Sequence, residues 1–323
     1  MRAIQVRTHG GPEVLEPVEL PDPTPGAGEL LVRIAAAGVN YIDTYKREGA
    51  YPTPTPFVPG EEGAGTVLAT GDGVTGFAEG DRVAWCGVLG AYTELAVVPA
   101  AAAIRVPDEL DDQRAAAALL QGMTAHYLTT STYPVRDGDT VLVHAAAGGT
   151  GLLITQLVKA RGGRVIGTVS TAAKEELARA AGADEIIRYT EVDDLAARVR
   201  ELTGGDGVAA VYDGVGKDTF DASLASLRRR GILVLFGASS GPVPPVDLQR
   251  LNAAGSLFVT RPKLADHVAT REELERRAGE VLSAASGGSL ELRIGATYPL
   301  AEARRAHEDL QSRRTTGKLL LLP

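Results

Sequence analysis

The sequence is poor in cysteine, and this scarcity excludes several kinds of protein. Cys86 is the only cysteine among 323 residues, so the chain cannot form an internal disulfide. It also cannot build a zinc site from clustered cysteines. A lone thiol suits a reducing compartment, and we expect a cytoplasmic protein.

Long apolar segments and an excess of positive charge are missing as well. No stretch approaches the roughly 20 apolar residues of a membrane helix, and residues 1–6 are expected to form a first strand rather than a secretion signal. The 41 acidic residues outnumber the 33 basic ones, which gives a net charge of -8 and argues against a general binder of nucleic acid. We therefore expect neither a membrane nor nucleic acid as a partner.

Motifs of hydrolases and metalloenzymes are absent. The sequence contains no H-E-x-x-H, no C-x-x-C, no Walker lysine motif and no G-x-S-x-G nucleophile elbow. The five histidines are scattered along the chain. His144 ends an apolar segment and is expected to be a packed core residue rather than a catalytic base.

The chain has two regions with different sequence patterns. From residue 1 to about 120, glycine and proline separate short apolar segments, and this pattern predicts a partly closed β-barrel or sandwich. Beyond residue 140, predicted strands alternate with predicted helices, which is typical of a doubly wound parallel sheet. We predict strands at 28–34, 65–69, 80–84, 92–98, 140–144, 164–169, 185–187, 208–213, 231–236 and 316–322, and helices at 111–133, 151–161, 174–181, 193–202 and 270–285.

A glycine-rich turn follows the first strand of the alternating region. The segment from Val141 to Ile154 contains the pattern A-x-x-G-x-x-G, with small residues at Ala145, Gly148 and Gly151. A strand that enters such a turn and leaves it as a helix lets the backbone approach a pyrophosphate closely. The N–H groups and the positive dipole end of that helix favour the phosphates. The segment predicts a dinucleotide site.

The end of the next strand indicates which dinucleotide binds. An Asp or Glu there would hold the ribose hydroxyls of NAD, but the sequence carries Ser170 and Lys174 and no carboxylate in between. A hydroxyl and a cation suit a 2′-phosphate, so we predict NADPH. The alternative is that Lys174 is merely a solvated residue at the start of its helix.

These motifs carry a family resemblance that runs along the whole chain. The sequence resembles the medium-chain dehydrogenase/reductase superfamily, and within it the zinc-free quinone oxidoreductases of the zeta-crystallin type. The segments that carry the resemblance are 38–45, 59–65, 145–151, 211–216 and 255–262. It implies an α/β fold with a Rossmann doubly wound parallel sheet and a GroES-like β-rich substrate domain, and a cleft between the two domains that holds the cofactor. The implied domains are 1–122 (substrate domain), 123–262 (NADP-binding domain) and 263–323 (completion of the substrate domain), and the implied assembly is a homodimer, joined through an edge strand near 256–260.

The resemblance also implies a set of site residues. It implies catalytic roles for Asn40, Tyr45 and Tyr51. It implies cofactor contacts for Asn40, Tyr41, Asp43, Thr124, Gly148, Gly149, Thr150, Gly151, Ser170, Lys174, Tyr189, Phe236, Ser240 and Arg313. Plainer interpretations stay open: Asn40 as a turn residue, Tyr41 and Tyr45 as one core face of a helix, and Arg313 as an exposed helical arginine.

The resemblance implies that no metal takes part. Zinc-dependent relatives carry a histidine and a cysteine ligand in segments that here hold Glu61 and, most nearly, Asn40. No set of His and Cys residues remains for the usual N/S ligands of a catalytic zinc.

The predicted activity is metal-free hydride or electron transfer from NADPH to a quinone or a similarly electron-poor carbonyl compound. Such chemistry belongs to the cofactor, while the protein aligns the reactants and excludes water. One alternative is an NADPH-dependent enone or enoyl-thioester reductase, with Tyr45 or Tyr51 as the proton donor. Alternatives outside catalysis are an NADPH sensor and a structural or RNA-binding crystallin-like protein.

Overall fold

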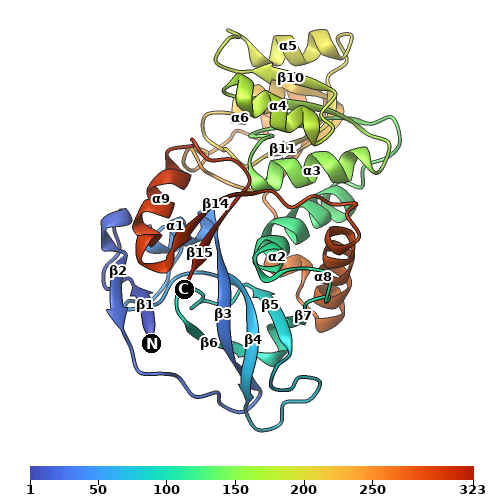
Figure 1. Ribbon diagram of the computed structural model, residues 1–323. Coiled ribbons are helices and arrows are strands. Elements are labelled where there is room, and N and C mark those ends of the chain that lie inside the picture. Colours follow the sequence, from blue (N-terminus) through green and yellow to red (C-terminus); the bar gives the residue numbers. More distant parts are fainter. The chain divides into compact units, whose positions relative to one another are not determined.

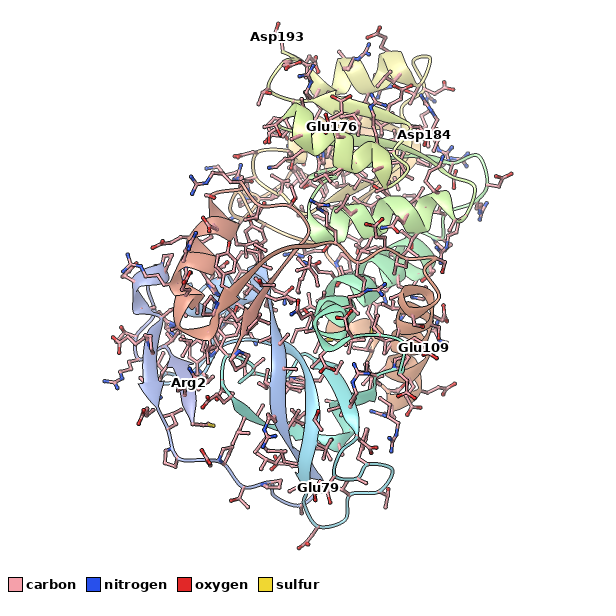
Figure 2. The ribbon with its side chains drawn as sticks, in the orientation of Figure 1. Arg2, Glu79, Glu109, Glu176, Asp184 and Asp193 are labelled. Atoms are coloured by element: carbon pink, nitrogen blue, oxygen red, sulfur yellow. The ribbon has the colours of Figure 1, made fainter.

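The computed structural model describes all residues from Met1 to Pro323, and the chain forms two compact units (Figure 1). Unit 1 consists of Met1–Met123 together with Val268–Pro323, and unit 2 consists of Thr124–His267. Charged side chains such as Arg2, Glu79, Glu109 and Asp193 extend into solvent (Figure 2). No helix is long and apolar enough to cross a membrane.

Unit 1 is built on a seven-stranded sheet. The strand order is β14-β15-β3-β4-β5-β7, and β6 pairs with β3 outside this path. Only the β14–β15 pair is parallel. The strands are β3 (Glu29–Val39), β4 (Glu62–Thr70), β5 (Arg82–Cys86), β6 (Leu95–Pro99), β7 (Ile104–Arg105), β14 (Ile294–Pro299) and β15 (Lys318–Leu322), and β1 (Arg2–Gln5) pairs with β2 (Glu16–Glu19) separately.

The core of unit 1 follows from alternation along these strands. Leu30, Val32 and Ile34 on β3 and Ala96 and Val98 on β6 point inward, so a single face of each strand is apolar. Three helices belong to unit 1: α1 (Tyr41–Glu48), α8 (Arg271–Ser286) and α9 (Ala303–Gln311). Helix α2 (Asp112–Tyr127) runs on from unit 1 into unit 2.

Unit 2 is a six-stranded parallel sheet with the order β10-β9-β8-β11-β12-β13. The strand order reverses between β8 and β11, and ligands of doubly wound sheets bind at such a reversal. The strands are β8 (Thr140–Val143), β9 (Arg164–Val169), β10 (Glu185–Arg188), β11 (Val208–Asp213), β12 (Leu227–Leu235) and β13 (Phe258–Thr260), and the helices are α3 (Gly149–Lys159), α4 (Ala172–Ala180), α5 (Leu195–Leu202), α6 (Phe220–Ser226) and α7 (Gln249–Ala253).

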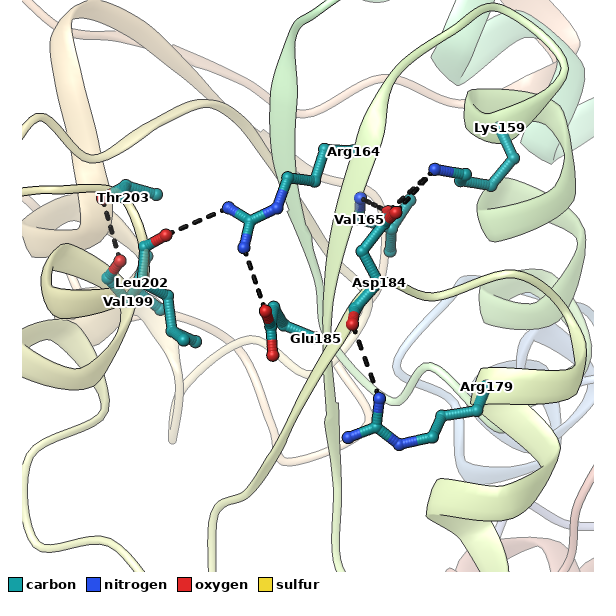
Figure 3. A network of polar contacts seen from close by, with 9 residues as sticks. All are labelled: Lys159, Arg164, Val165, Arg179, Asp184, Glu185, Val199, Leu202 and Thr203. Carbon is teal, nitrogen blue, oxygen red and sulfur yellow. Dashed lines mark hydrogen bonds and ion pairs between the residues drawn. The ribbon is translucent and has the colours of Figure 1, made fainter.

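Polar contacts secure the amino-terminal ends of β9 and β10. Asp184 accepts hydrogen bonds from Lys159 at 2.7 Å and from the backbone N–H of Val165 at 2.7 Å, while Arg164 pairs with Glu185 and donates to the carbonyl of Leu202 (Figure 3). These groups are half-exposed, so each ion pair adds little stability. They fix the end of the sheet opposite to its carboxyl edge.

Several predicted elements have other bounds in the structure: the strand predicted for 28–34 runs on to Val39, and the one predicted for 65–69 begins at Glu62. The helix predicted for 111–133 ends as an α-helix at Tyr127 and continues as a wider π-type turn from Leu128 to Thr132. Strand β12 begins at Leu227, before the predicted start at 231. The prediction missed this beginning because it is rich in arginine and shows no hydrophobic pattern. The doubly wound α/β class and the β-rich second unit are confirmed.

Candidate active site

The glycine-rich turn joins β8 to the N-terminus of α3. Gly148 caps α3 with an extended backbone, and its N–H donates to the carbonyl of Ala145 at 2.8 Å. The first N–H groups of a helix have no acceptor within the helix, so those of Gly149, Thr150 and Gly151 are available to an anion. The turn therefore offers backbone donors and a positive helix end at the reversal of the sheet.

The turn is too crowded at Gly151 for a larger residue. A Cβ atom at Gly151 would lie 2.9 Å from the Cα atom of Ala146, and closer still to the carbonyl oxygen of Ala145. Both neighbours are backbone and cannot move aside easily. Ala145 itself has a φ of 50°, a left-handed conformation that a residue with a Cβ adopts at a cost.

Three predicted 2′-phosphate residues gather at the carboxyl ends of β9 and β10. The Nζ atom of Lys174 lies 3.4 Å from the Oγ atom of Ser170, and partial burial lowers the pKa of this ammonium group. Tyr189 follows β10, donates its N–H to Val169, and leaves 45% of its surface exposed. A hydroxyl and an ammonium group thus meet at the end of β9, as a phosphate requires, and Tyr189 lies at the end of the neighbouring strand.

Phe236 and Ser240 lie beyond the carboxyl ends of β11 and β12. The Oγ atom of Ser240 donates to the carbonyl of Val215 at 2.8 Å and accepts from the N–H of Asp218 at 3.0 Å. The Phe236 ring covers Gly214, where a Cβ would lie 2.9 Å from the ring. These contacts join the two loops that follow β11 and β12.

His144 is a packed core residue, as predicted. It is 2% exposed, and its two ring nitrogens contact the hydroxyls of Thr168 at 3.0 Å and Ser223 at 2.9 Å. Burial lowers the pKa of His144, which keeps the ring neutral. Asp213 accepts hydrogen bonds from Val215, Gly216, Thr219 and Ser223 and thus holds the turn after β11.

In unit 1, helix α1 presents its tyrosines away from its buried face. The buried residues of α1 are Asp43, Thr44 and Arg47, whereas Tyr41 and Tyr45 are half-buried. The interpretation of Tyr41 and Tyr45 as a core face is therefore wrong. The Tyr45 ring lies 6.3 Å from that of Tyr41 and 5.5 Å from that of Tyr51, which is 40% exposed.

Asn40 caps α1 and is held at both its backbone and its side chain. Its N–H donates to Asp43 at 2.8 Å. Its side-chain oxygen accepts from Lys318 at 2.6 Å, and its side-chain nitrogen donates to Glu62 at 3.0 Å. Lys318 and Glu62 also form an ion pair with each other and are 2% and 0% exposed.

A chain of hydrogen bonds connects Asp43 to Arg47 through two neutral groups. The Tyr92 hydroxyl donates to Asp43 at 3.1 Å and lies 3.0 Å from the Nε2 atom of His307, whose Nδ1 atom lies 2.9 Å from Arg47. Because arginine only donates, the His307 proton is assigned to Nε2 and points to Tyr92. Burial and Arg47 lower the pKa of His307 to about 3.

Asp43 is the member of this chain whose hydrogen bonding is incomplete. Its Oδ1 atom is buried and has no partner. Burial outweighs its hydrogen bonds and raises the pKa of Asp43 to about 7, well above the usual value. Protonation removes the buried negative charge, which is why burial raises this pKa.

The structure brings the predicted residues together in two groups. In unit 2, Ser170 and Lys174 follow β9 and Tyr189 follows β10, on one side of β8 and its turn 148–151, whereas Phe236 and Ser240 follow β12 on the other side. Thr124 is half-buried on α2. In unit 1, Tyr41, Asp43 and Tyr45 belong to α1, Asn40 caps this helix, and the Tyr51 ring contacts that of Tyr45. Arg313 follows α9 with a φ of 58° and lies near Tyr41, where its charge counteracts the burial that raises the pKa of Tyr41.

Sequence reasoning missed the groups that hold Asn40 and Asp43. The sequence patterns assign no role to Lys318, Tyr92, His307 or Arg47, and they include Glu62 only in the segment 59–65 that carries the resemblance. One signal for Lys318 was present: it is a single charge directly before the apolar segment Leu319–Leu322. No pattern in the sequence points from residue 318 to residues 40 and 62.

Two family models match this chain. Residues 26–108 match an alcohol dehydrogenase GroES-like domain, and residues 149–272 match a zinc-binding dehydrogenase. A quinone oxidoreductase of Pseudomonas aeruginosa is 48% identical over 324 residues, which span 100% of this chain and 99% of the relative. The chain belongs to the quinone oxidoreductase family.

Two solved structures of similar proteins extend this finding to the fold. A mycobacterial protein complexed with NADPH is 54% identical, covers 100% of both chains and superposes with a TM-score of 0.97. The quinone oxidoreductase of Escherichia coli complexed with NADPH is 45% identical, also over 100% of both chains and with a TM-score of 0.97. The predicted resemblance to this family is confirmed.

Proposed function

We propose that this member of the family is an NADPH-dependent quinone oxidoreductase. The observation that carries the proposal is the cluster of Ser170, Lys174 and Tyr189 beside the glycine-rich turn, without an acidic residue in the position that selects NAD. Relatives of matching length that were solved with NADPH support the same cofactor.

The residues of unit 2 fit this cofactor. Close contact with the backbone of Ala145 and Ala146 requires glycine at position 151, and the N–H groups of Gly149, Thr150 and Gly151 would bind the pyrophosphate. Lys174 would pair with the 2′-phosphate while Ser170 donates a hydrogen bond. When bound, NADPH supplies the hydride.

The residues of unit 1 would orient the acceptor. The rings of Tyr45 and Tyr51 lie 5.5 Å apart at an angle of 51° and offer aromatic surface to a flat substrate. Their hydroxyls would donate hydrogen bonds to the oxygens of a quinone. A reduced quinone can take its protons from water, so no dedicated strong acid is required.

We infer that the reaction needs no metal. The family model's name mentions zinc, but ammonium groups already pair with the two carboxylates of the corresponding segment. Lys46 contacts Glu61, and Lys318 contacts Glu62. A cation beside each carboxylate opposes binding of a second one. Metal analysis of active protein is expected to find no stoichiometric zinc, and full loss of turnover with a chelator would contradict this.

The decisive experiment is a steady-state assay of NADPH oxidation with 1,4-benzoquinone-type acceptors, alongside a panel of alkenals and enoyl thioesters. Faster turnover of quinones supports the proposal, and faster turnover of the panel favours the enone reductase. Binding of NADPH without turnover of any acceptor would indicate a sensor. In the same assay, Lys174→Ala should weaken NADPH by tenfold or more, at about 1.5–3 kcal/mol for a charge-assisted hydrogen bond, and leave NADH almost unchanged.

We further propose a cytoplasmic homodimer with domain boundaries at 122/123 and 262/263. The edge strand β13 supports a dimer, because Phe258 and Val259 are 60% and 38% exposed on an unpaired sheet edge. Pairing of two such edges would cover both residues. Sedimentation should give twice the mass of one chain, and Phe258→Asp should halve it; a wild-type monomer would overturn the proposal.

A further inference from the structure

We propose that unit 2 carries a second anion site, which binds a small diphosphate compound at the amino-terminal edge of its parallel sheet. The site is a cavity of about 760 Å³ at the edge opposite to the glycine-rich turn. Its lining contains four arginines, Arg164, Arg200, Arg228 and Arg229, and one carboxylate, that of Asp206. The whole chain has a net charge of -8, so this gathering of positive charge is an exception in an acidic protein.

The walls of the cavity all belong to unit 2. Thr140 begins β8, Arg164 begins β9 and Leu202 ends α5. Gly207, with a φ of 87°, brings the loop after α5 against the start of β12, because a Cβ there would lie 2.6 Å from the carbonyl oxygen of Ser226. Most of the lining residues are exposed or half-buried, so a solute can enter from the solvent.

A bulge at the start of β12 aims two consecutive arginines at this cavity. Between Leu227 and Ile232, β12 advances five residues while its partner β11 advances two. Arg230, within the bulge, has a left-handed backbone with a φ of 58°, which a residue with a Cβ adopts at a cost. A regular strand would place Arg228 and Arg229 on opposite faces of the sheet, whereas here both line the same cavity.

Two of the four guanidinium groups have no carboxylate partner. Arg200 donates three hydrogen bonds to backbone carbonyls at 3.0–3.1 Å, which hold the group in place and leave two of its five N–H donors free. Arg229 is exposed and makes no hydrogen bond or ion pair with the rest of the chain. The cavity thus combines a fixed guanidinium group with a movable one.

The other two arginines are partly neutralised. Arg164 pairs with Glu185 at 3.1 Å (Figure 3), and Arg228 pairs with Asp139 at 3.3 Å. Such partly exposed pairs contribute little stability, so a phosphate group can share these arginines without a large loss.

The lining indicates which part of a ligand is recognised. Guanidinium groups bind phosphate oxygens through paired hydrogen bonds. No aromatic side chain lines the cavity, so nothing there can stack on a nucleobase. A diphosphate presents oxygens to both Arg200 and Arg229, and we expect its two phosphate groups to supply the affinity.

The test is a calorimetric titration of inorganic pyrophosphate into the full chain saturated with NADPH, which keeps the glycine-rich turn occupied. We expect one pyrophosphate to bind per chain. Arg229→Met should weaken it about tenfold or more, as expected for a lost charge-assisted hydrogen bond. Asp206→Asn, which removes the opposing carboxylate, should strengthen it about twofold.

Arg230→Met is the matched control. It removes the same charge from the next residue of the bulge, which does not line the cavity, so the affinity should stay within about twofold of wild type. Urea unfolding should show that Arg229→Met is as stable as wild type, because its guanidinium group has no partner to lose. The comparison of the two variants does not depend on the identity of the cofactor, so a failure of the proposed function leaves it valid.

Three results would overturn the inference. They are the absence of pyrophosphate binding to the NADPH-saturated protein, wild-type affinity in Arg229→Met, and equal losses in Arg229→Met and Arg230→Met, which would indicate a diffuse positive surface. A parallel titration with ADP identifies the source of the diphosphate. Equal affinities for ADP and pyrophosphate support an inorganic ligand, and tighter binding of ADP that is still weakened by Arg229→Met supports a nucleoside diphosphate.

Discussion

The two units present their functional groups in opposite ways. In unit 2 the turn 148–151 offers backbone N–H groups, and close backbone contacts exclude a side chain at Gly151. In unit 1 the residues around Asn40 are side chains, many of them charged and fully buried. Backbone donors need no charge to be balanced, whereas each buried charge needs a partner. Substitutions should therefore act by steric exclusion in unit 2 and by loss of charge balance in unit 1.

The largest expected effect comes from removing one buried charge. Lys318→Met leaves the Glu62 carboxylate buried without a cation, which should lower the free energy of unfolding by about 3–5 kcal/mol. Urea unfolding measures this loss. Lys174→Met in unit 2 is the matched control: its half-buried ammonium group has no comparable structural task, so stability should stay within about 0.5 kcal/mol. Equal losses of unfolding free energy in both variants would contradict the inferred difference between the two units.

A second prediction tests steric exclusion in unit 2. Gly151→Ala places a methyl group against the backbone of Ala145 and Ala146, so we expect a loss of about 1–3 kcal/mol in unfolding free energy and weaker NADPH binding. Gly279 on α8 provides the control, because a Cβ there meets nothing within 4 Å. Gly279→Ala should instead stabilise the protein by up to about 1 kcal/mol. Unimpaired NADPH binding by Gly151→Ala would contradict the role of the turn.

The third prediction uses pH, and it concerns the buried chain of unit 1. Burial raises the pKa of Asp43 to about 7, so the stability that Asp43 contributes is fully present below its ordinary pKa and is lost as the pH rises through 7. Burial lowers the pKa of His307 to about 3, so its contribution is fully present above its ordinary pKa and is lost as the pH falls towards 3.

The two pH dependences of stability have opposite signs, so replacing one of the two groups reveals the pH dependence that the other causes. In His307→Gln the unfolding free energy should fall between pH 4 and pH 7, because only Asp43 remains. In Asp43→Asn it should rise over the same range, because only His307 remains. Urea unfolding of both variants at a series of pH values tests the direction of each change. Identical pH profiles of the two variants would show that neither group titrates as inferred.

The smallest expected effect concerns Ala145. Its φ of 50° suits glycine better than alanine, so Ala145→Gly should leave stability unchanged or raise it by up to about 1 kcal/mol. NADPH affinity should not change, because the backbone of the turn is kept. Ala284→Gly inside α8 is the control, and it should cost about 1 kcal/mol. A clear loss in Ala145→Gly would mean that the Ala145 methyl group contributes packing that outweighs its strain.

The part of the site that depends on local sequence was predictable. The strand, turn and helix of residues 140–159 are consecutive, so their spacing alone indicated the phosphate site and the neighbouring Ser170 and Lys174. The alternation of strands and helices likewise predicted the parallel sheet. The assignment of these residues to the cofactor stays a prediction.

The buried network of unit 1 was not predictable, because it joins distant residues. Asn40 meets Lys318 across 278 positions, and Tyr92 meets His307 across 215. No periodicity relates such positions, and a lysine beside a leucine-rich strand reads as an ordinary edge residue. The burial of Asp43 was equally hidden, since the only core face considered for this helix was the alternative that placed Tyr41 and Tyr45 there.

The position of Lys318 has a consequence for how the chain acquires its structure during synthesis. Strand β15, which carries this residue, emerges only after all of unit 2 has been made. The parallel sheet can close as a unit on the ribosome, since domains generally fold as they emerge. Until β15 pairs with β3, however, the Glu62 carboxylate has no cation. The nascent amino-terminal segment must therefore wait, partly unfolded, for a strand encoded some 250 codons later.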